Sequence, residues 1–332
     1  MAARNTWIAS ARSHPLYRQA DLIGGGFLLA FTSGPGQTWF IALFATALQA
    51  ELALSPGGFG SLYSIATLSS GLLLAWVGAK VDDVPPRRFA LATAIVLAAA
   101  CLGMAAATHP LMLLPIVFLL RLTGQGLMSH LSMTILARGF DAARGRALGI
   151  GSLGFPVSQA ILPVLATLGL FTLGWRFTWL VVGGVVLGVV LPLLALLLRR
   201  AQLPERRGPG PARGSSWRER LDLLMERRFL LLLPTVFAPS FVLTALFFHQ
   251  GSLIAAKGWS VAWFATSVAV FAAFSLIGML GSGFLVDRIG ARRLVALSLL
   301  PQVLAMLLLA GGGSVLWLMP AMALAGLSSA GN

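Results

Sequence analysis

Charged residues are scarce in this 332-residue chain, and their scarcity excludes a soluble fold. Asp, Glu, Lys and Arg make up only 10% of the sequence, hydrophobic residues make up 58%, and the mean hydropathy is +0.88. A soluble domain carries about 25% charged residues, because its surface has to be solvated. The composition therefore indicates a polytopic membrane protein.

Cysteine and acidic residues are also few. The single cysteine, Cys101, lies inside an apolar run, so no disulfide can form within the chain. All ten Asp and Glu residues lie at the ends of apolar runs or between them, so none is predicted at membrane mid-depth. The sequence also lacks an H-E-x-x-H motif and paired intramembrane aspartates. We therefore expect neither an intramembrane enzyme nor a metal or other cofactor.

Long apolar runs dominate the sequence instead. A transmembrane helix needs about 20 apolar residues at about 1.5 Å each, and ten runs reach that length. We predict helices, because a backbone in hydrocarbon must satisfy its own hydrogen bonds and these runs do not alternate as barrel strands do. The predicted spans are approximately residues 21–49, 59–79, 88–107, 110–135, 146–171, 174–198, 229–250, 262–285, 293–311 and 314–332.

The basic residues are distributed unequally between the two sides of these spans. Of the 24 Lys and Arg residues, 21 fall on one side, Arg176 and Lys257 fall on the other, and Arg121 lies inside a span. The basic side is predicted to be cytoplasmic, together with the N-terminus and the segment 199–228. We expect a multi-pass protein of the bacterial inner membrane. Loop charges account for the net charge of +14, so no nucleic-acid partner is expected.

A charged motif occurs twice and indicates an internal repeat. Its members are Gly78, Asp82, Arg87 and Arg88 in the first copy and Gly283, Asp287, Arg292 and Arg293 in the second, 205 positions later. The repeat predicts a transmembrane half at 1–198, a cytoplasmic basic linker at 199–228 and an incomplete second half at 229–332. The same offset places the counterparts of the fifth and sixth runs beyond Asn332, so we expect a protein of about twelve helices and about 400 residues.

The second copy reads G-x-x-x-D-R-x-G-x-R-R and also contains Arg288 and Gly290. This pattern resembles the charged motif of major facilitator superfamily transporters, which lies between the second and third helices and again between the eighth and ninth. The first copy departs from it, with Asp83 at the basic position and Pro85 and Pro86 at the glycine step. The resemblance implies an all-α membrane protein with two pseudo-symmetric six-helix halves, of which about ten helices are present.

The same resemblance gives the motif residues a gating role. It implies that Asp82 or Asp287 clasps a neighbouring helix N-terminus and the motif arginines in the inward-closed state. The electrostatics agree, since a carboxylate near a helix N-terminus is favoured by about 0.3 to 1 kcal/mol. The alternative is that the arginines serve only as topology signals.

Arg121 is predicted near mid-depth of the fourth helix, where a charge costs about 2.5 to 3.5 kcal/mol and must face protein or water. With Gly124 and Gly126 it resembles the fourth-helix motif R-x-x-G-x-G of the superfamily. One interpretation is that Arg121 is the counter-charge for an anionic substrate, because its forked donors match a carboxylate. The other is that it hydrogen-bonds carbonyl groups of the first helix and holds the half together.

Polar residues in other spans complete the predicted substrate site. In the first helix, Gln37 and Thr38 follow Pro35, where a helix break frees backbone groups that a cavity can use; the alternative is helix packing through small residues. The other substrate-binding candidates are Gln125, Gln159, His249 and Gln250. For His249, a hydrogen-bonded interfacial position is the alternative to a proton-coupling role.

The sequence therefore predicts a secondary transporter that moves a small solute by rocker-switch alternating access. Arg121 favours an organic anion as the solute. The alternative of a drug efflux antiporter comes from Gly149, Gly151, Gly154 and Pro156, which resemble a fifth-helix motif of antiporters. A non-transporting sensor on the same fold is a further alternative. Expected partners are the solute, the lipid bilayer and a coupling ion, either H⁺ or a counter-substrate, and we expect a monomer.

Overall fold

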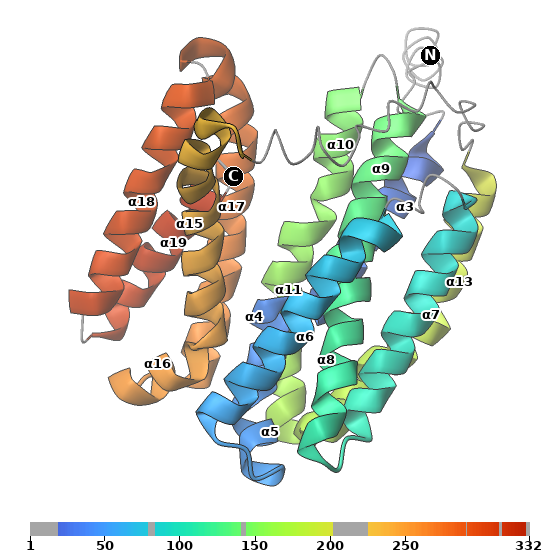
Figure 1. Ribbon diagram of the computed structural model, residues 1–332, viewed down its shortest axis with the longest axis vertical. Helices are drawn as coiled ribbons and strands as arrows, with labels where there is room; N and C mark the ends of the chain where they lie inside the picture. The colour runs from blue at the N-terminus through green and yellow to red at the C-terminus, as the bar shows by residue number, and fades with distance from the viewer. Residues whose placement is uncertain are drawn as a thin grey trace, which may run out of the picture. The chain divides into compact units, whose positions relative to one another are not determined.

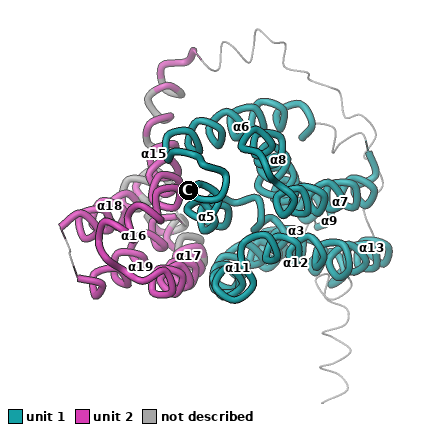
Figure 2. The backbone as a smooth tube through the Cα atoms, turned by 90° about the horizontal axis from the view of Figure 1, so that it is seen from below, with its two compact units in different colours: residues 1–204 teal, residues 205–332 magenta. Residues whose placement is uncertain are grey.

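The computed structural model describes residues 19–78, 84–140, 144–201, 225–289, 291–311 and 314–329. Every regular element in these ranges is a helix (Figure 1). The chain divides into two compact units, residues 1–204 and 205–332, which Figure 2 colours separately.

The first unit contains six consecutive helical passes, several of which are broken into segments. The elements of the first three passes are α3 (Ala20–Thr32), η1 (Gly34–Gly36), α4 (Thr38–Ile41), η2 (Ala42–Phe44), α5 (Ala45–Glu51), α6 (Pro56–Val77) and α7 (Pro86–Ala105). Those of the next three are η4 (Pro110–Met112), α8 (Leu113–Leu120), η5 (Arg121–Met128), α9 (Ser129–Gly139), α10 (Arg144–Ser152), α11 (Gly154–Thr172), α12 (Gly174–Val185), η6 (Val186–Val190) and α13 (Leu191–Arg200). The first pass bends by 45° between Ala20–Gly36 and Thr38–Glu51.

The second unit is shorter. Its elements are α15 (Arg227–Phe248), α16 (Gln250–Lys257), α17 (Val261–Ile289), α18 (Ala291–Gly311), η7 (Val315–Trp317) and α19 (Leu318–Ser329). The chain bends by 61° between the end of α15 and α16, with His249 at the bend.

Each predicted run corresponds to a helical pass. Among the described residues, six helices are long and apolar enough to cross a membrane, or eight if each bent pair forms one span. The last two runs contribute the shorter apolar stretches Leu299–Gly311 and Val315–Ser329.

The internal repeat is visible in the boundaries of the helices. The pairs α5 and α16, α7 and α18, and η4 and η7 each begin 205 residues apart. The caps also match, because His109 Nδ1 accepts a hydrogen bond from the backbone N–H of Leu111 at 3.2 Å, and Ser314 Oγ accepts one from that of Leu316 at 3.3 Å. The two units therefore share local structure as well as sequence, as expected for pseudo-symmetric halves.

The two basic residues opposite the Arg-rich segments have equivalent roles. Arg176 Nη1 donates to the carbonyl of Ala105 at 2.9 Å, and Lys257 Nζ donates to the carbonyl of Ala310 at 3.2 Å. Ala105 and Ala310 lie 205 residues apart, in the last turns of α7 and α18. A cation there is favourable, because the final carbonyls of a helix lack partners and carry partial negative charge.

Arg176 also contacts a further pass of the first unit, the first one. Its Nη2 lies 2.8 Å from Glu51 Oε1 at the end of α5, and its Nε donates to the same oxygen at 2.9 Å. The indole Nε1 of Trp175 donates to Glu51 Oε2. This cluster of Glu51, Trp175 and Arg176 joins the ends of α5, α7 and α12.

Candidate functional site

The first pass is broken at its centre by the sequence Gly34-Pro35-Gly36. Pro35 has no N–H and cannot continue the hydrogen-bond ladder of α3, so the chain forms the short turn η1 and then passes through Gln37 in an extended conformation (φ −81°, ψ 149°). A new helix, α4, begins at Thr38. The break leaves the carbonyl of Gly36 available to a side chain from another pass.

The fourth pass approaches this break with backbone against backbone. A Cβ on Gly36 would lie 2.1 Å from the carbonyl oxygen of Leu120, and one on Gly124 would lie 2.7 Å from Gly36 Cα. No other residue type fits at either position without a backbone shift. The approaching segment is η5, whose π-helical turn runs from Arg121 to Met128; such turns are rare and frequently occur at functional sites.

Arg121 uses this approach to reach the first pass. Its Nη1 donates to the carbonyl of Gly36 at 3.2 Å and to Thr38 Oγ1 at 3.0 Å. Its Cζ lies 5.5 Å from the ring centroid of Tyr63 in α6, and the Tyr63 hydroxyl donates to Thr38 Oγ1 at 2.8 Å. Arg121, Thr38 and Tyr63 therefore form one buried polar cluster, in which Arg121 is only 7% exposed.

The guanidinium group is only partly satisfied. Its Nε is buried without a hydrogen-bond partner, and neither Nε nor Nη2 donates to any residue that the structure describes. Within the described ranges no carboxylate pairs with Arg121. The hydrogen bond from Arg121 to a first-helix carbonyl, which the helix-holding interpretation predicts, is present. The edge of the guanidinium group formed by Nε and Nη2 makes no hydrogen bond to a described residue.

Other predicted site residues of the first unit lie around the same break. Gln37 is buried and its Nε2 donates to Ser33 Oγ at a long 3.4 Å. Gln159 is also buried, on α11, which packs against η1 and α4. Its neighbour Ser158 lies nearer to the break, because a Cβ on Gly34 would be 2.4 Å from Ser158 Oγ. Gln125 is exposed.

His249 and Gln250 belong to the second unit, where they occupy the bend between α15 and α16. His249 is exposed and Gln250 is buried. In the same unit a buried amide connects three helices: Gln302 Nε2 donates to the carbonyl of Pro239 at 3.0 Å, and Gln302 Oε1 accepts from Ser328 Oγ at 3.1 Å. Gln302 was not among the site residues predicted from the sequence.

The predicted gating residues of the first motif are only partly described. Gly78 caps α6 and is buried, with the imidazole of His130 beside it. Asp82 falls outside the described residues. Arg87 is half-buried at the start of α7, and Arg88 next to it is exposed.

In the second motif the charged residues lie mainly in helices rather than in a turn. Helix α17 extends to Ile289, four residues beyond the predicted end of its run, and α18 begins at Ala291. Gly283 and Asp287 therefore belong to α17 and Arg292 to α18, but their side chains, like Gly290 as a whole, lie outside the described part. Arg288 and Arg293 are exposed.

Tyr63 is the most informative residue that sequence reasoning missed. The chain has only two tyrosines, and a phenol in the middle of an apolar run needs a hydrogen-bond partner there. The rarity of tyrosine in the chain, together with its place in an apolar run, could have indicated that Tyr63 belongs to a buried polar cluster. The cluster of Glu51, Trp175 and Arg176 was missed as well, because nothing local joins residues 125 positions apart.

Comparison with known protein families decides the identity of the fold. The sequence profile described as the Major Facilitator Superfamily matches residues 26–332. The chain belongs to the Major Facilitator Superfamily. This confirms the resemblance found in the charged motifs, and a multi-pass membrane protein of this superfamily also explains the apolar helices.

Solved structures of superfamily transporters share this fold. A bacterial homolog of the human lysosomal transporter Spinster, in an inward-facing and unoccupied conformation, has a TM-score of 0.72 at 17% identity, with 95% of this chain and 74% of that chain covered. The nucleoside transporter NupG has a TM-score of 0.69 at 12% identity, with 95% and 80% covered. The xylose transporter XylE from E. coli has a TM-score of 0.64 at 15% identity, with 96% and 81% covered. A search of curated proteins finds no match.

Proposed function

We propose that this member of the superfamily is a secondary transporter that moves a small organic anion, with Arg121 as the counter-charge at the binding site. The observation that supports this most directly is the buried guanidinium group whose Nε and Nη2 donate to no described residue. A buried charge is expensive unless it is paired. A solute carboxylate would supply the missing pair.

The geometry suits a carboxylate in particular. Nη1 is held by Gly36 and Thr38, which fixes the plane of the guanidinium group. The edge formed by Nε and Nη2 then presents two parallel donors, the arrangement that carboxylates accept in a bidentate manner. Tyr63 supports it by holding Thr38 and by lying against the cation. Gln37, Gln125, Gln159, His249 and Gln250 are the further candidates for contacts to the rest of the solute.

Transport by alternating access completes the proposal. The two repeated halves would rock about the site, with Gly78, Asp82, Arg87 and Arg88 and the second motif as the cytoplasmic gate. The break at Pro35 lies next to Arg121 and gives the first pass a flexible joint. In this proposal the protein is a monomer of the bacterial inner membrane with a cytoplasmic N-terminus, and it is not an enzyme.

The drug-antiporter alternative loses part of its support. A Cβ on Gly154 would lie 2.1 Å from the carbonyl oxygen of Phe27, and one on Gly151 would lie 2.2 Å from the side chain of Leu136. Close packing of α10 and α11 against α3 and α9 therefore accounts for these glycines without reference to antiport.

The test is flux of labelled organic anions into proteoliposomes. Arg121→Ala should abolish carboxylate flux. Arg121→Lys should reduce it strongly, because an ammonium keeps the charge but loses the fork. Arg199→Ala is the matched control, since Arg199 is an exposed cation at the end of α13. Carboxylate flux that is indifferent to Arg121→Ala, in a variant whose Cys101 remains protected from thiol reagents, would refute the proposal.

A further inference from the structure

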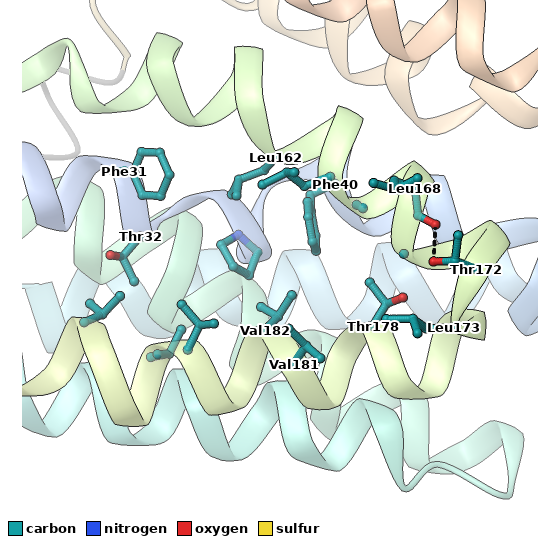
Figure 3. A pocket seen from close by; sticks show the side chains of 17 residues that line it. Phe31, Thr32, Phe40, Leu162, Leu168, Thr172, Leu173, Thr178, Val181 and Val182 are labelled. Atoms are coloured by element: carbon teal, nitrogen blue, oxygen red, sulfur yellow. Dashed lines mark hydrogen bonds between the residues drawn. The ribbon is translucent and has the colours of Figure 1, made fainter.

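A groove of about 330 Å³ lies in the first unit between α11 and α12. Figure 3 shows Leu162 and Leu168 of α11 across it from Val181 and Val182 of α12. The volume is within the range of small-ligand sites, about 300 to 1,000 Å³. This groove is separate from the Arg121 cluster, and transport as proposed above makes no use of it.

The side chains that line the groove offer no free hydrogen-bond donor. Its only polar lining residues are three threonines, and each hydroxyl donates to a carbonyl of its own helix: Thr32 to Leu28 at 2.7 Å, Thr172 to Leu168 at 2.8 Å and Thr178 to Gly174 at 2.8 Å. A polar solute entering here would lose hydrogen bonds to water and find only these three hydroxyl oxygens as acceptors. The groove therefore selects an apolar ligand.

The length of the groove matches one leaflet of a bilayer. Along α12 and η6 it extends from Thr178 to Val190, a helical rise of about 18 Å, which is a little more than half of the ~30 Å hydrocarbon core. The two passes that form it are both long and apolar enough to cross a membrane. One end lies at the α11–α12 turn beside Trp175 and Arg176, residue types that mark the membrane interface.

The groove is also open along its side. Leu165, Leu168 and Val181 line it and are 56%, 59% and 41% exposed. Exposed apolar surface at this depth is surface for lipid chains. The mouth carries no unbalanced charge, because Arg176 is paired with Glu51 at 2.8 Å.

We propose that this groove binds one acyl chain of a phospholipid from the leaflet at the α11–α12 turn. The chain extends from the interface to mid-depth, and the headgroup stays at the mouth. Its tail packs against Pro35 and Phe40, which also line the groove, and so supports the broken segment that carries Gly36. Binding depends on the acyl chain and is indifferent to headgroup charge.

The test is photolabelling of the purified protein in nanodiscs with a phospholipid that carries a diazirine on its acyl chain, followed by peptide mass spectrometry. We expect labels in α11 and α12 in excess over α6, whose Leu68 and Leu72 are both 67% exposed and line no part of this groove. Replacing a choline headgroup by an anionic glycerol headgroup should leave this excess unchanged.

Two filling variants on opposite walls make the test specific. Val182→Phe and Ala166→Leu should each remove the excess labelling. The matched control is Val189→Phe, because Val189 is on the same pass and 57% exposed but lies outside the groove. Protection of Cys101 from thiol reagents shows that each variant is folded. Because the two substitutions lie on opposite walls, the test can still be made with one variant if the other does not fold.

Three outcomes would overturn the proposal. Labelling could be as strong on α6 as in the groove, or it could persist in both filling variants. Residues of the groove could instead cross-link to a second copy of the chain, which would make this face a protein interface.

Discussion

The substitution Gly36→Ala tests the contact on which the Arg121 cluster is built. A single added methyl group would lie 2.1 Å from the carbonyl oxygen of Leu120 and 2.7 Å from the backbone nitrogen of Gln125. Both atoms belong to the backbone of the fourth pass, so no side-chain rotation can relieve the contact. The two passes must move apart, and the hydrogen bond from Arg121 to Gly36 is then stretched or lost.

The expected loss of stability has two parts. Overpacking of a tight contact costs about 1 to 3 kcal/mol, and a weakened bond to a charged donor adds up to about 1.5 to 3 kcal/mol. A loss of about 2 kcal/mol or more is therefore expected for Gly36→Ala. The matched control is Gly71→Ala in α6, where the new methyl group meets nothing within 4 Å; alanine should stabilise that helix by about 0.5 to 1 kcal/mol.

The chain carries its own reporter for this measurement. Cys101 is the only cysteine and is 0% exposed, so a thiol-reactive fluorophore in detergent reports unfolding of the first unit. At about 2 to 4 °C for each kcal/mol in a unit of this size, Gly36→Ala should melt at least about 5 °C below Gly71→Ala. Equal melting temperatures for the two variants would show that the close approach of the first and fourth passes is not formed as described.

Three further predictions concern other polar contacts. Tyr63→Phe should lower the melting temperature of the first unit by the equivalent of about 1 kcal/mol, since one buried hydrogen bond is lost; an unchanged value would exclude that bond. Glu51→Gln should lower it in dilute buffer, with the difference shrinking in high salt because the partner Arg176 is partly exposed; a salt-independent effect would contradict this. Gln302→Leu should increase hydrogen exchange in α18, because it removes the hydrogen bonds of this amide to the Pro239 carbonyl and the Ser328 hydroxyl; unaltered protection would contradict these contacts.

Much of the fold could be predicted from the apolar runs and from one repeated motif. A backbone in hydrocarbon must satisfy its own hydrogen bonds, so the apolar runs could be predicted as helices. The 205-residue offset between Gly78 and Gly283 predicted the matched helix starts in the two units. The boundaries near charges were harder to predict. Helix α17 continues through Asp287 to Ile289, because a helix needs no apolar side chains once it has left the hydrocarbon.

The candidate site was only partly predictable. Arg121 and Thr38 stood out because polar groups are rare at mid-depth, but sequence spacing does not show which pass a side chain meets. The contact to Gly36 depends on the break at Pro35 and on the π-helical turn of the fourth pass, and neither leaves a signature that fixes the partner. The cluster of Glu51 and Arg176 was unpredictable for the same reason, since its members come from different passes.

The bonds from Arg176 to Ala105 and from Lys257 to Ala310 have a consequence for how the chain inserts. A cation on the side with few basic residues competes with the rule that orients the protein during synthesis. Both such cations here are anchored to an equivalent carbonyl, although one comes from the sixth pass and the other from the end of the bent seventh pass. The same helix end therefore binds a positive charge in both units, although a different residue supplies the charge in each.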